Sequence, residues 1–205
     1  MKITRYVSSG MLENCYVVED ENNKVCAVID PGDVIDELID HINGLNVGYI
    51  MLTHGHFDHI GGVQKIKAIT SAPVVIHNGD VEMLKDPMLN LSAHVGMDIS
   101  LKPDIVLNGG ELIAVGEITI NVVHTPGHTP GSVCYVCDGV MFSGDTIFAQ
   151  SIGRTDFVGG DSKKIKDSIE MMIKLYPDVM LYPGHGESAM MREFVKNWST
   201  LKLIL

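Results

Sequence analysis

Five of the nine histidines share a setting that suits metal chemistry. Each lies beside glycine, proline or aspartate, directly after a predicted strand. Imidazoles at i and i+2 near a strand end point to one side, and Asp58 with His59 adds a second pair in the same loop. One short loop therefore offers four metal ligands. The five histidines are His54, His56, His59, His128 and His185.

These residues predict two metal ions rather than one. A single ion of four or five coordination cannot use all four loop ligands plus His128 and His185, but two ions that share a carboxylate can. Asp145, at the end of a predicted strand in FSGD, is the natural bridge. Five imidazoles and two carboxylates without a thiolate favour an open catalytic site over a closed structural one. We expect two divalent ions, zinc first, with iron or manganese as alternatives.

The predicted elements place each of these residues at the end of a strand. Apolar residues at helical spacing mark helices whose apolar faces a sheet must cover, which indicates two packed sheets with helices outside, a four-layer α/β architecture. Segment 78–100 is expected to be a helix plus loop that fills the core rather than a pocket wall. The predicted strands are 3–7, 15–19, 24–29, 47–53, 73–76, 111–115, 117–123, 133–136, 140–142 and 179–182, and the main helices span 34–42, 63–69, 165–176 and 191–201.

Composition narrows the class of protein further. A chain of 205 residues with 45% hydrophobic and 20% charged residues is expected to form one folded domain, residues 1–205. The net charge of −11, without a block of lysine or arginine, argues against a nucleic-acid partner. No apolar run reaches the roughly 18 residues of a membrane span, and no secretion signal is visible, so we expect a cytoplasmic protein without a membrane partner. Cys134 and Cys137 lie in an apolar, β-branched run and are expected to be buried rather than redox-active.

Four segments together resemble the metallo-β-lactamase superfamily, and a fifth narrows the branch. The resemblance implies an αββα sandwich of two similar halves. The branch looks like the short glyoxalase-II-like (hydroxyacylglutathione hydrolase-like) enzymes, which implies that the C-terminal helical substrate domain of full-length glyoxalase II is absent. The four segments are THGHFDH (53–59), TPGHTPGS (125–132), SGDT (143–146) and PGHG (183–186), and the fifth is GRTDF (153–157).

The same resemblance assigns the ligands. It implies that one metal is held by His54, His56 and His128, the other by Asp58, His59 and His185, and that Asp145 bridges them. Asp58 would also orient the attacking hydroxide.

Arg154 follows Asp145 by nine residues, where full-length glyoxalase II carries a lysine that contacts glutathione, so it is the predicted substrate-binding residue. Asp156, however, stands where a tyrosine contacts glutathione in those enzymes. This departure weakens the case for glutathione as part of the substrate.

The expected activity is hydrolysis of a small-molecule thioester, S-lactoylglutathione or a related compound, by a hydroxide that bridges the two metals. A thiol with a pKa near about 8.5 leaves without much acid assistance, which suits a site without a separate general acid. Two alternatives remain: a mononuclear iron persulfide dioxygenase, which also carries GRTDF, and a noncatalytic metal-binding module. The PGHG segment favours hydrolysis over the dioxygenase. The sequence does not predict the oligomeric state.

Overall fold

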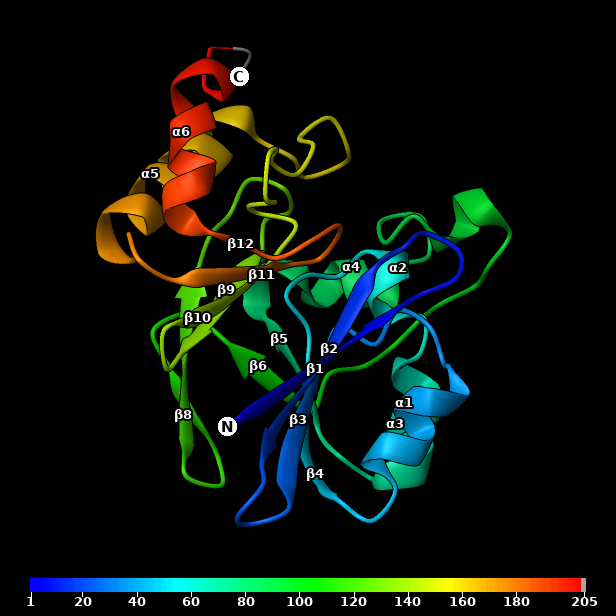
Figure 1. The fold of residues 1–205 in the computed structure, drawn as a ribbon. Coiled ribbons are helices and arrows are strands. Elements are labelled where there is room, and N and C mark those ends of the chain that lie inside the picture. The colour runs from blue at the N-terminus through cyan, green and yellow to red at the C-terminus, as the bar shows by residue number, and fades with distance from the viewer. Residues whose placement is uncertain (204–205) are drawn as a thin grey trace.

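The computed structural model describes residues 1–203, in which two six-stranded sheets pack face to face (Figure 1). The first sheet holds the first six strands in chain order. Its β1–β2 and β2–β3 pairs are antiparallel, and the pairs from β3 to β6 are parallel. The strands are β1 (Lys2–Val7), β2 (Asn14–Asp20), β3 (Val25–Ile29), β4 (Asn46–Met51), β5 (Val74–His77) and β6 (Ile105–Leu107).

The second sheet is built from the later strands, again in sequential order. The β10–β11 pair is parallel and the other pairs are antiparallel. Each part of the chain therefore forms its own sheet. The strands are β7 (Leu112–Val115), β8 (Ile118–His124), β9 (Val133–Cys137), β10 (Val140–Gly144), β11 (Met180–Pro183) and β12 (Ala189–Met190).

Helices cover the two outer faces of the sandwich. In Figure 1, α1 and α3 lie on one side of the sheets, and α5 and α6 lie on the other. Both outer layers pack apolar side chains onto their sheet. The predicted four-layer αββα sandwich is therefore confirmed. The helices are α1 (Asp36–Ile42), α2 (Phe57–Ile60), α3 (Val63–Thr70), α4 (Val81–Lys85), α5 (Ser162–Leu175) and α6 (Met191–Leu201), with 3-10 turns η1 (Asn78–Asp80) and η2 (Ser92–Val95).

Strand β2 shows why the sequence folds this way. Cys15 and Val17 join the core beneath α1 and α3, while Tyr16 and Val18 join the core between the sheets. Successive side chains of a strand point to opposite faces, so the middle of a strand that is covered on both sides is apolar at consecutive positions.

The structure refines the sequence-based elements in three places. Residues 57–60 of the ligand loop form the one-turn helix α2. A strand at 105–107, absent from the predicted strands, pairs in parallel with β5 at the edge of the first sheet. Segment 78–100 contains α4 and two 3-10 turns. Its methionines divide between the two predicted roles, because Met83 is buried while Met97 is 54% exposed and lines a cleft.

The predicted fate of the CxxC pair is confirmed. Cys134 and Cys137 are 0% and 5% exposed and carry free thiols. Burial raises the pKa of the Cys134 thiol to about 11 and that of Cys137 to about 12. Both therefore stay protonated at neutral pH and pack as small apolar residues.

Candidate metal centre

The seven predicted ligands meet where strands of both sheets end. His54 and His56 follow β4, and the single turn of α2 presents Asp58 and His59. The other three lie after β8, β10 and β11. The carboxyl ends of strands in α/β proteins are where loops most often build a site. Two predicted triads form, and in each the three candidate ligand atoms lie within 4.8 Å of one another: His54, His56 and His128, and Asp58, His59 and His185.

The first triad consists of three buried imidazoles. Nδ1 of His56 lies 3.0 Å from Nε2 of His128. The ring of His54 is 4.8 Å from that of His56 and 4.7 Å from that of His128, between ring centroids. All three side chains are at most 3% exposed. Three imidazoles that converge in a buried site form a typical half of a metal coordination shell.

The second triad combines one carboxylate with two imidazoles. Oδ2 of Asp58 lies 3.3 Å from Nε2 of His185 and 3.9 Å from Nε2 of His59. His59 is fully buried, whereas the side chain of His185 is 27% exposed. The second triad therefore lies nearer to solvent than the first.

Asp145 lies between the two triads. Its Oδ1 is 3.3 Å from Nε2 of His59, and its Oδ2 is 3.6 Å from Nε2 of His128. The same Oδ2 is 3.7 Å from Nε2 of His185. A carboxylate that faces both ligand groups is placed where a bridge between two ions would have to be.

Buried polar atoms without partners show that these residues fit cations. Nε2 of His54, His56 and His59 and Oδ1 of Asp145 are buried and accept or donate no well-aligned hydrogen bond. Such atoms are costly to bury unless a partner satisfies them. Gly184 keeps space beside them, because a Cβ there would overlap Oδ1 of Asp145 and lie 2.6 Å from Cε1 of His59. The donor set and the open space suit divalent ions such as zinc, iron or manganese.

Burial and charge favour the metal-binding forms of His54, His56 and Asp145. Burial, aided by His128, lowers the pKa of His56 to about 3, and burial lowers the pKa of His54 well below its usual value. Burial alone would raise the pKa of Asp145, but His59, among other histidines, holds it below the usual range. Burial alone would also lower the pKa of His59 and of His185, but the neighbouring carboxylates of Asp58 and Asp145 raise both pKa values in the metal-free site. Neutral imidazoles and an ionised carboxylate are the forms that bind metals.

Asp30 orients the ligand loop from behind. Its Oδ1 accepts a hydrogen bond from the Thr53 N–H at 2.7 Å, and its Oδ2 bonds the Thr53 hydroxyl and lies 2.9 Å from Nδ1 of His59. Asp30 also lies close enough to His54 and His59 to form a third possible ligand cluster. Both oxygens of Asp30 already have hydrogen-bond partners, so we do not count it among the metal ligands. We assign it the role of orienting the His59 ring, as carboxylates that hydrogen-bond to metal-binding histidines commonly do.

Asp80 joins the two histidine loops. Its Oδ2 accepts hydrogen bonds from the Gly55 N–H at 3.0 Å and from the Thr129 hydroxyl at 2.7 Å, and its Oδ1 accepts from the Gly131 N–H at 2.6 Å. The side chain is completely buried. The sequence analysis missed both Asp30 and Asp80. Asp30 directly follows β3, which pairs in parallel with β4, so Asp30 lies at the same sheet edge as the ligand loop after β4. Its position at a strand end is the signal that could have identified it.

Glu13 is a third buried acid that the sequence analysis missed. It is 0% exposed, and neither carboxylate oxygen has a hydrogen-bond partner. Its backbone forms an isolated bridge with His185. Burial raises its pKa well above the usual value, and the charge of Asp30 adds to the shift while that of His59 opposes it. Glu13 therefore keeps its proton to a higher pH than an exposed glutamate does.

Arg154 reaches the site by its backbone. Its carbonyl oxygen lies 2.7 Å from Nδ1 of His128 and so orients that ring. Its guanidinium forms two hydrogen bonds with Asp156, at 2.7 and 2.6 Å, and lies 3.9 Å above the Phe157 ring. The predicted role in substrate binding remains a prediction, and the side chain is paired within its own loop.

Comparisons with known proteins agree with this geometry. A profile of the metallo-beta-lactamase superfamily matches residues 9–185, and the chain therefore belongs to that superfamily. It is 32% identical over 182 residues to the hydroxyacylglutathione hydrolase GloC of Haemophilus influenzae, covering 85% of each chain.

Two solved structures are also similar. The BLEG-1 B3 metallo-beta-lactamase superposes with a TM-score of 0.91 at 35% identity, over 98% of this chain and 99% of that one. TTHA1623 in a di-iron-bound form gives a TM-score of 0.81 at 30% identity, over 95% and 98%.

These matches confirm the expected family and support a metal-dependent hydrolase in general terms. Within residues 1–203, no helix combines the length and apolarity that a bilayer crossing requires. The single-domain boundary stays a prediction, and residues 204 and 205 at its end lie outside the described part of the chain.

Proposed function

We propose that this protein is a binuclear metal-dependent thioester hydrolase of the glyoxalase-II-like type. The observation that carries the proposal is the position of Asp145 between two ligand triads. The similarity to a protein named hydroxyacylglutathione hydrolase supports the thioester class. Zinc is the proposed metal, although a di-iron structure among the similar proteins keeps iron open.

The proposed division of the ligands is the one that the family resemblance implies. His54, His56 and His128 would hold one ion, Asp58, His59 and His185 the other, and Asp145 would contact both. Divalent ions held there supply Lewis acidity and activate water for attack on an acyl carbon.

Asp58 is the side chain best placed to direct the attack. It projects from α2 into the cleft beside His185 and remains partly exposed, so its carboxylate can accept a hydrogen bond from a water molecule while acting as a ligand. Burial alone would raise its pKa, but His59 and the hydrogen bond to His185 lower it. Asp58 is therefore ionised at neutral pH and can accept that hydrogen bond.

The leaving group explains why a thioester suits this cleft. The carboxylates and imidazoles that line the cleft are all proposed ligands and so are not free to act as a general acid. Among the described residues that line it, Arg154 is the single residue of the lysine or arginine type. A thiolate leaves readily without a proton donor, whereas an amide nitrogen does not. The chemistry that the cleft can perform without a separate acid is therefore thioester hydrolysis.

The test combines metal content with a substrate panel. Protein reconstituted with zinc, iron or manganese is analysed for ions per chain and assayed with S-lactoylglutathione and uncharged thioesters by thiol release. We expect two ions per chain, thioester hydrolysis without oxygen consumption, and at least a 100-fold loss of kcat in Asp58→Asn (about 2.7 kcal/mol). Asp178→Asn, an exposed control, should retain full activity.

Other outcomes would identify the alternatives. One iron per chain with consumption of oxygen and a persulfide would indicate a dioxygenase. Metal-loaded protein that turns over neither thioesters nor persulfides would indicate a noncatalytic metal-binding module. Both results would overturn the proposal. Cytoplasmic location and the lack of nucleic-acid or membrane partners remain part of the proposal.

A further inference from the structure

We infer that an apolar lobe beside the metal centre binds an aliphatic or aromatic substituent of the substrate, so that the preferred thioesters carry an apolar chain rather than glutathione. This inference rests on the proposed thioester hydrolysis and names the substrate class. The apolar lobe is defined by six side chains: Met11, Phe57, Leu91, Val95, Phe157 and Val158.

Two clefts meet at the centre to form this lobe. One, of about 410 Å³, has His56, Asp58, His128, Asp145 and His185 among its lining residues. The other, of about 400 Å³, is lined mainly by apolar side chains. They share Met11, Phe57, Leu91 and Phe157, so the apolar cleft continues directly from the proposed ligands. A substrate whose carbonyl lies over the centre would place one substituent in the apolar cleft.

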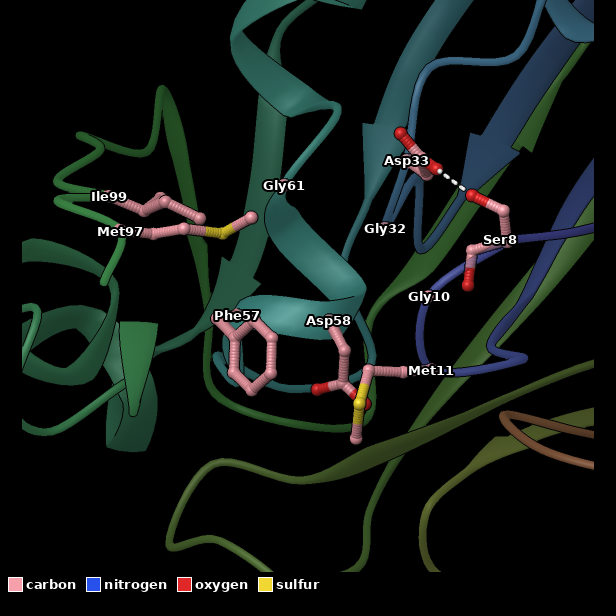
Figure 2. A pocket seen from close by; sticks show the side chains of 11 residues that line it. Ser8, Gly10, Met11, Gly32, Asp33, Phe57, Asp58, Gly61, Met97 and Ile99 are labelled. Carbon is pink, nitrogen blue, oxygen red and sulfur yellow. Dashed lines mark hydrogen bonds between the residues drawn. The ribbon is translucent and has the colours of Figure 1, made fainter. Parts of the chain in front are cut away.

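A third cleft, of about 440 Å³, opens on the other side of the same residues. Figure 2 shows Met11 and Phe57 on either side of the Asp58 carboxylate, with Met97 and Ile99 beyond Phe57. Met11 and Phe57 thus flank the Asp58 carboxylate on its two sides (Figure 2), although Ser8 and Asp33 also line this third cleft. An anionic substituent in this third cleft would lose water and meet Asp33 and Asp58 instead of a cation.

The lobe exposes more apolar surface than the fold requires. Met11, Val95 and Val158 are 52%, 51% and 60% exposed, and they border one cleft although they come from three different segments. Scattered exposed apolar residues are ordinary, but a contiguous group at a cleft usually marks a binding site. The site they mark here adjoins the proposed ligands.

Leu91 is held in the lobe by a strained backbone. Its φ of +70° is in the left-handed region, which is unfavourable for leucine. The neighbouring Asn90 holds this turn: its side chain donates to the Ile99 carbonyl at 2.8 Å and accepts from the Ser92 N–H at 3.0 Å. The Asn90 carbonyl accepts from the N–H of Phe57 at 2.9 Å. The turn therefore couples Leu91 to the helix that carries Asp58.

Charge argues against glutathione as the preferred substituent. Of the described residues that line these three clefts, one is a lysine or arginine, namely Arg154. Its guanidinium donates two hydrogen bonds to Asp156. Asp33 and Asp58 also line them. The two carboxylates of glutathione would therefore meet acidic side chains and an Arg154 guanidinium that is already paired with Asp156. The net charge of −11 on the chain adds to this repulsion.

The experiment varies chain length on each side of the thioester. One arm uses N-acetylcysteamine thioesters from acetyl to octanoyl, and the other uses acetyl thioesters of alkyl thiols from ethyl to octyl. Both are assayed with metal-loaded protein by thiol release. We expect kcat/KM to rise by up to about fourfold per methylene in one arm, which identifies the substituent that enters the lobe. The best substrate should exceed S-lactoylglutathione.

Variants locate the effect. Val95→Ser and Val158→Ser change exposed side chains at the lobe and should flatten the dependence on chain length. Leu112→Ser, at a residue 70% exposed on β7, is the matched control and should leave that dependence unchanged. Asp156→Asn weakens the pairing of Arg154 and should raise kcat/KM for S-lactoylglutathione severalfold.

The outcomes separate the two proposals. Hydrolysis of thioesters at rates that do not depend on chain length in either arm, or a clear preference for S-lactoylglutathione, would overturn the apolar lobe and leave the proposed function intact. Lack of hydrolysis in both arms and of S-lactoylglutathione by metal-loaded protein would overturn both. Retained chain-length dependence in both valine variants would show that the lobe is not the binding site.

Discussion

Asp80 accepts a hydrogen bond of 3.0 Å from the backbone N–H of Gly55, the residue between His54 and His56. The same oxygen accepts from the Thr129 hydroxyl, next to His128. One buried carboxylate thus fixes the spacing of the two loops that supply the first triad. Burial raises the pKa of Asp80, but three donated hydrogen bonds oppose this shift and satisfy both oxygens.

We expect Asp80→Asn to weaken metal binding. Asparagine has a single acceptor oxygen, so its amide group would face a backbone or hydroxyl donor and the loops would move apart. Loss of such supporting partners typically lowers metal affinity by about 10- to 100-fold. Competition with a chromophoric chelator measures this change. Asp98→Asn, at an exposed position in the same segment, should bind metal like the wild type, and equal affinities in all three proteins would contradict the assigned role.

Asp30→Asn is expected to weaken one of the two metal-binding steps. Asp30 has a φ of +49°, which asparagine tolerates, so the backbone should be kept while the charge beside His59 is lost. The affinity of the step that uses His59 should fall by about 10- to 100-fold, with the other step changed little. Calorimetric titration resolves the two steps. Asp33→Asn is the nearby control, and a uniform loss in both steps would point to misfolding instead.

Glu13→Gln should change how stability depends on pH in the metal-free protein. Folded Glu13 has a raised pKa, chiefly through burial, so between its unfolded value of about 4.3 and the folded value the native state holds a proton that the unfolded state has lost. Wild-type stability therefore falls as pH rises through that window, by up to about 1.4 kcal/mol per pH unit. Glutamine removes this contribution.

Urea unfolding between pH 4 and pH 8 tests the prediction. The stability of Glu13→Gln relative to the wild type should increase with pH and then level off above the folded pKa. Glu21→Gln, which changes an exposed glutamate, should follow the wild-type curve. Bound divalent ions favour the ionised carboxylate and should reduce the difference. Parallel curves for Glu13→Gln and the wild type would show that Glu13 is ionised in the native state.

Tyr16→Phe is expected to lower the free energy of unfolding by about 0.5–1.5 kcal/mol. The buried Tyr16 hydroxyl donates to the Pro183 carbonyl at 2.7 Å and ties β2 to the loop of His185. The cost is modest because the Asn14 side chain also donates to that carbonyl, at 2.9 Å. Chemical denaturation measures it. The Tyr49 hydroxyl has no hydrogen bond to the described residues, so Tyr49→Phe should change the free energy of unfolding by less. Similar losses in both variants would show that the Tyr16 hydrogen bond does not contribute to stability.

The predicted layers followed from local patterns. The continuous run of buried residues in β2 and the helical stripes in α5 and α6 are local patterns, so the sequence alone indicates which faces must be covered. Strand 105–107 was not among the predicted strands, because three apolar residues make too short a pattern to identify a strand. Its pairing with β5, nearly thirty residues earlier, makes it the edge strand of the first sheet.

The proposed ligands were visible in the sequence because their residue types and spacing carry the information. The ligands of open catalytic sites are mostly histidine and carboxylate side chains, and a strand end presents them at fixed intervals. Asp80 and Glu13 gave no such signal. Their roles depend on partners far along the chain, such as Thr129 for Asp80 and the acids that surround Glu13.

The amino-acid sequence by itself indicated the family, through the segments that resemble it, and the four layers and the set of ligand types, which depend on periodicity and on chemistry local to each strand end. Tertiary structure decided which carboxylates hold the loops, that Arg154 is paired with Asp156, and that Met11, Leu91 and Val158 border one cleft. Those relationships join residues from separate segments, and they exist only once both sheets and their loops have packed together.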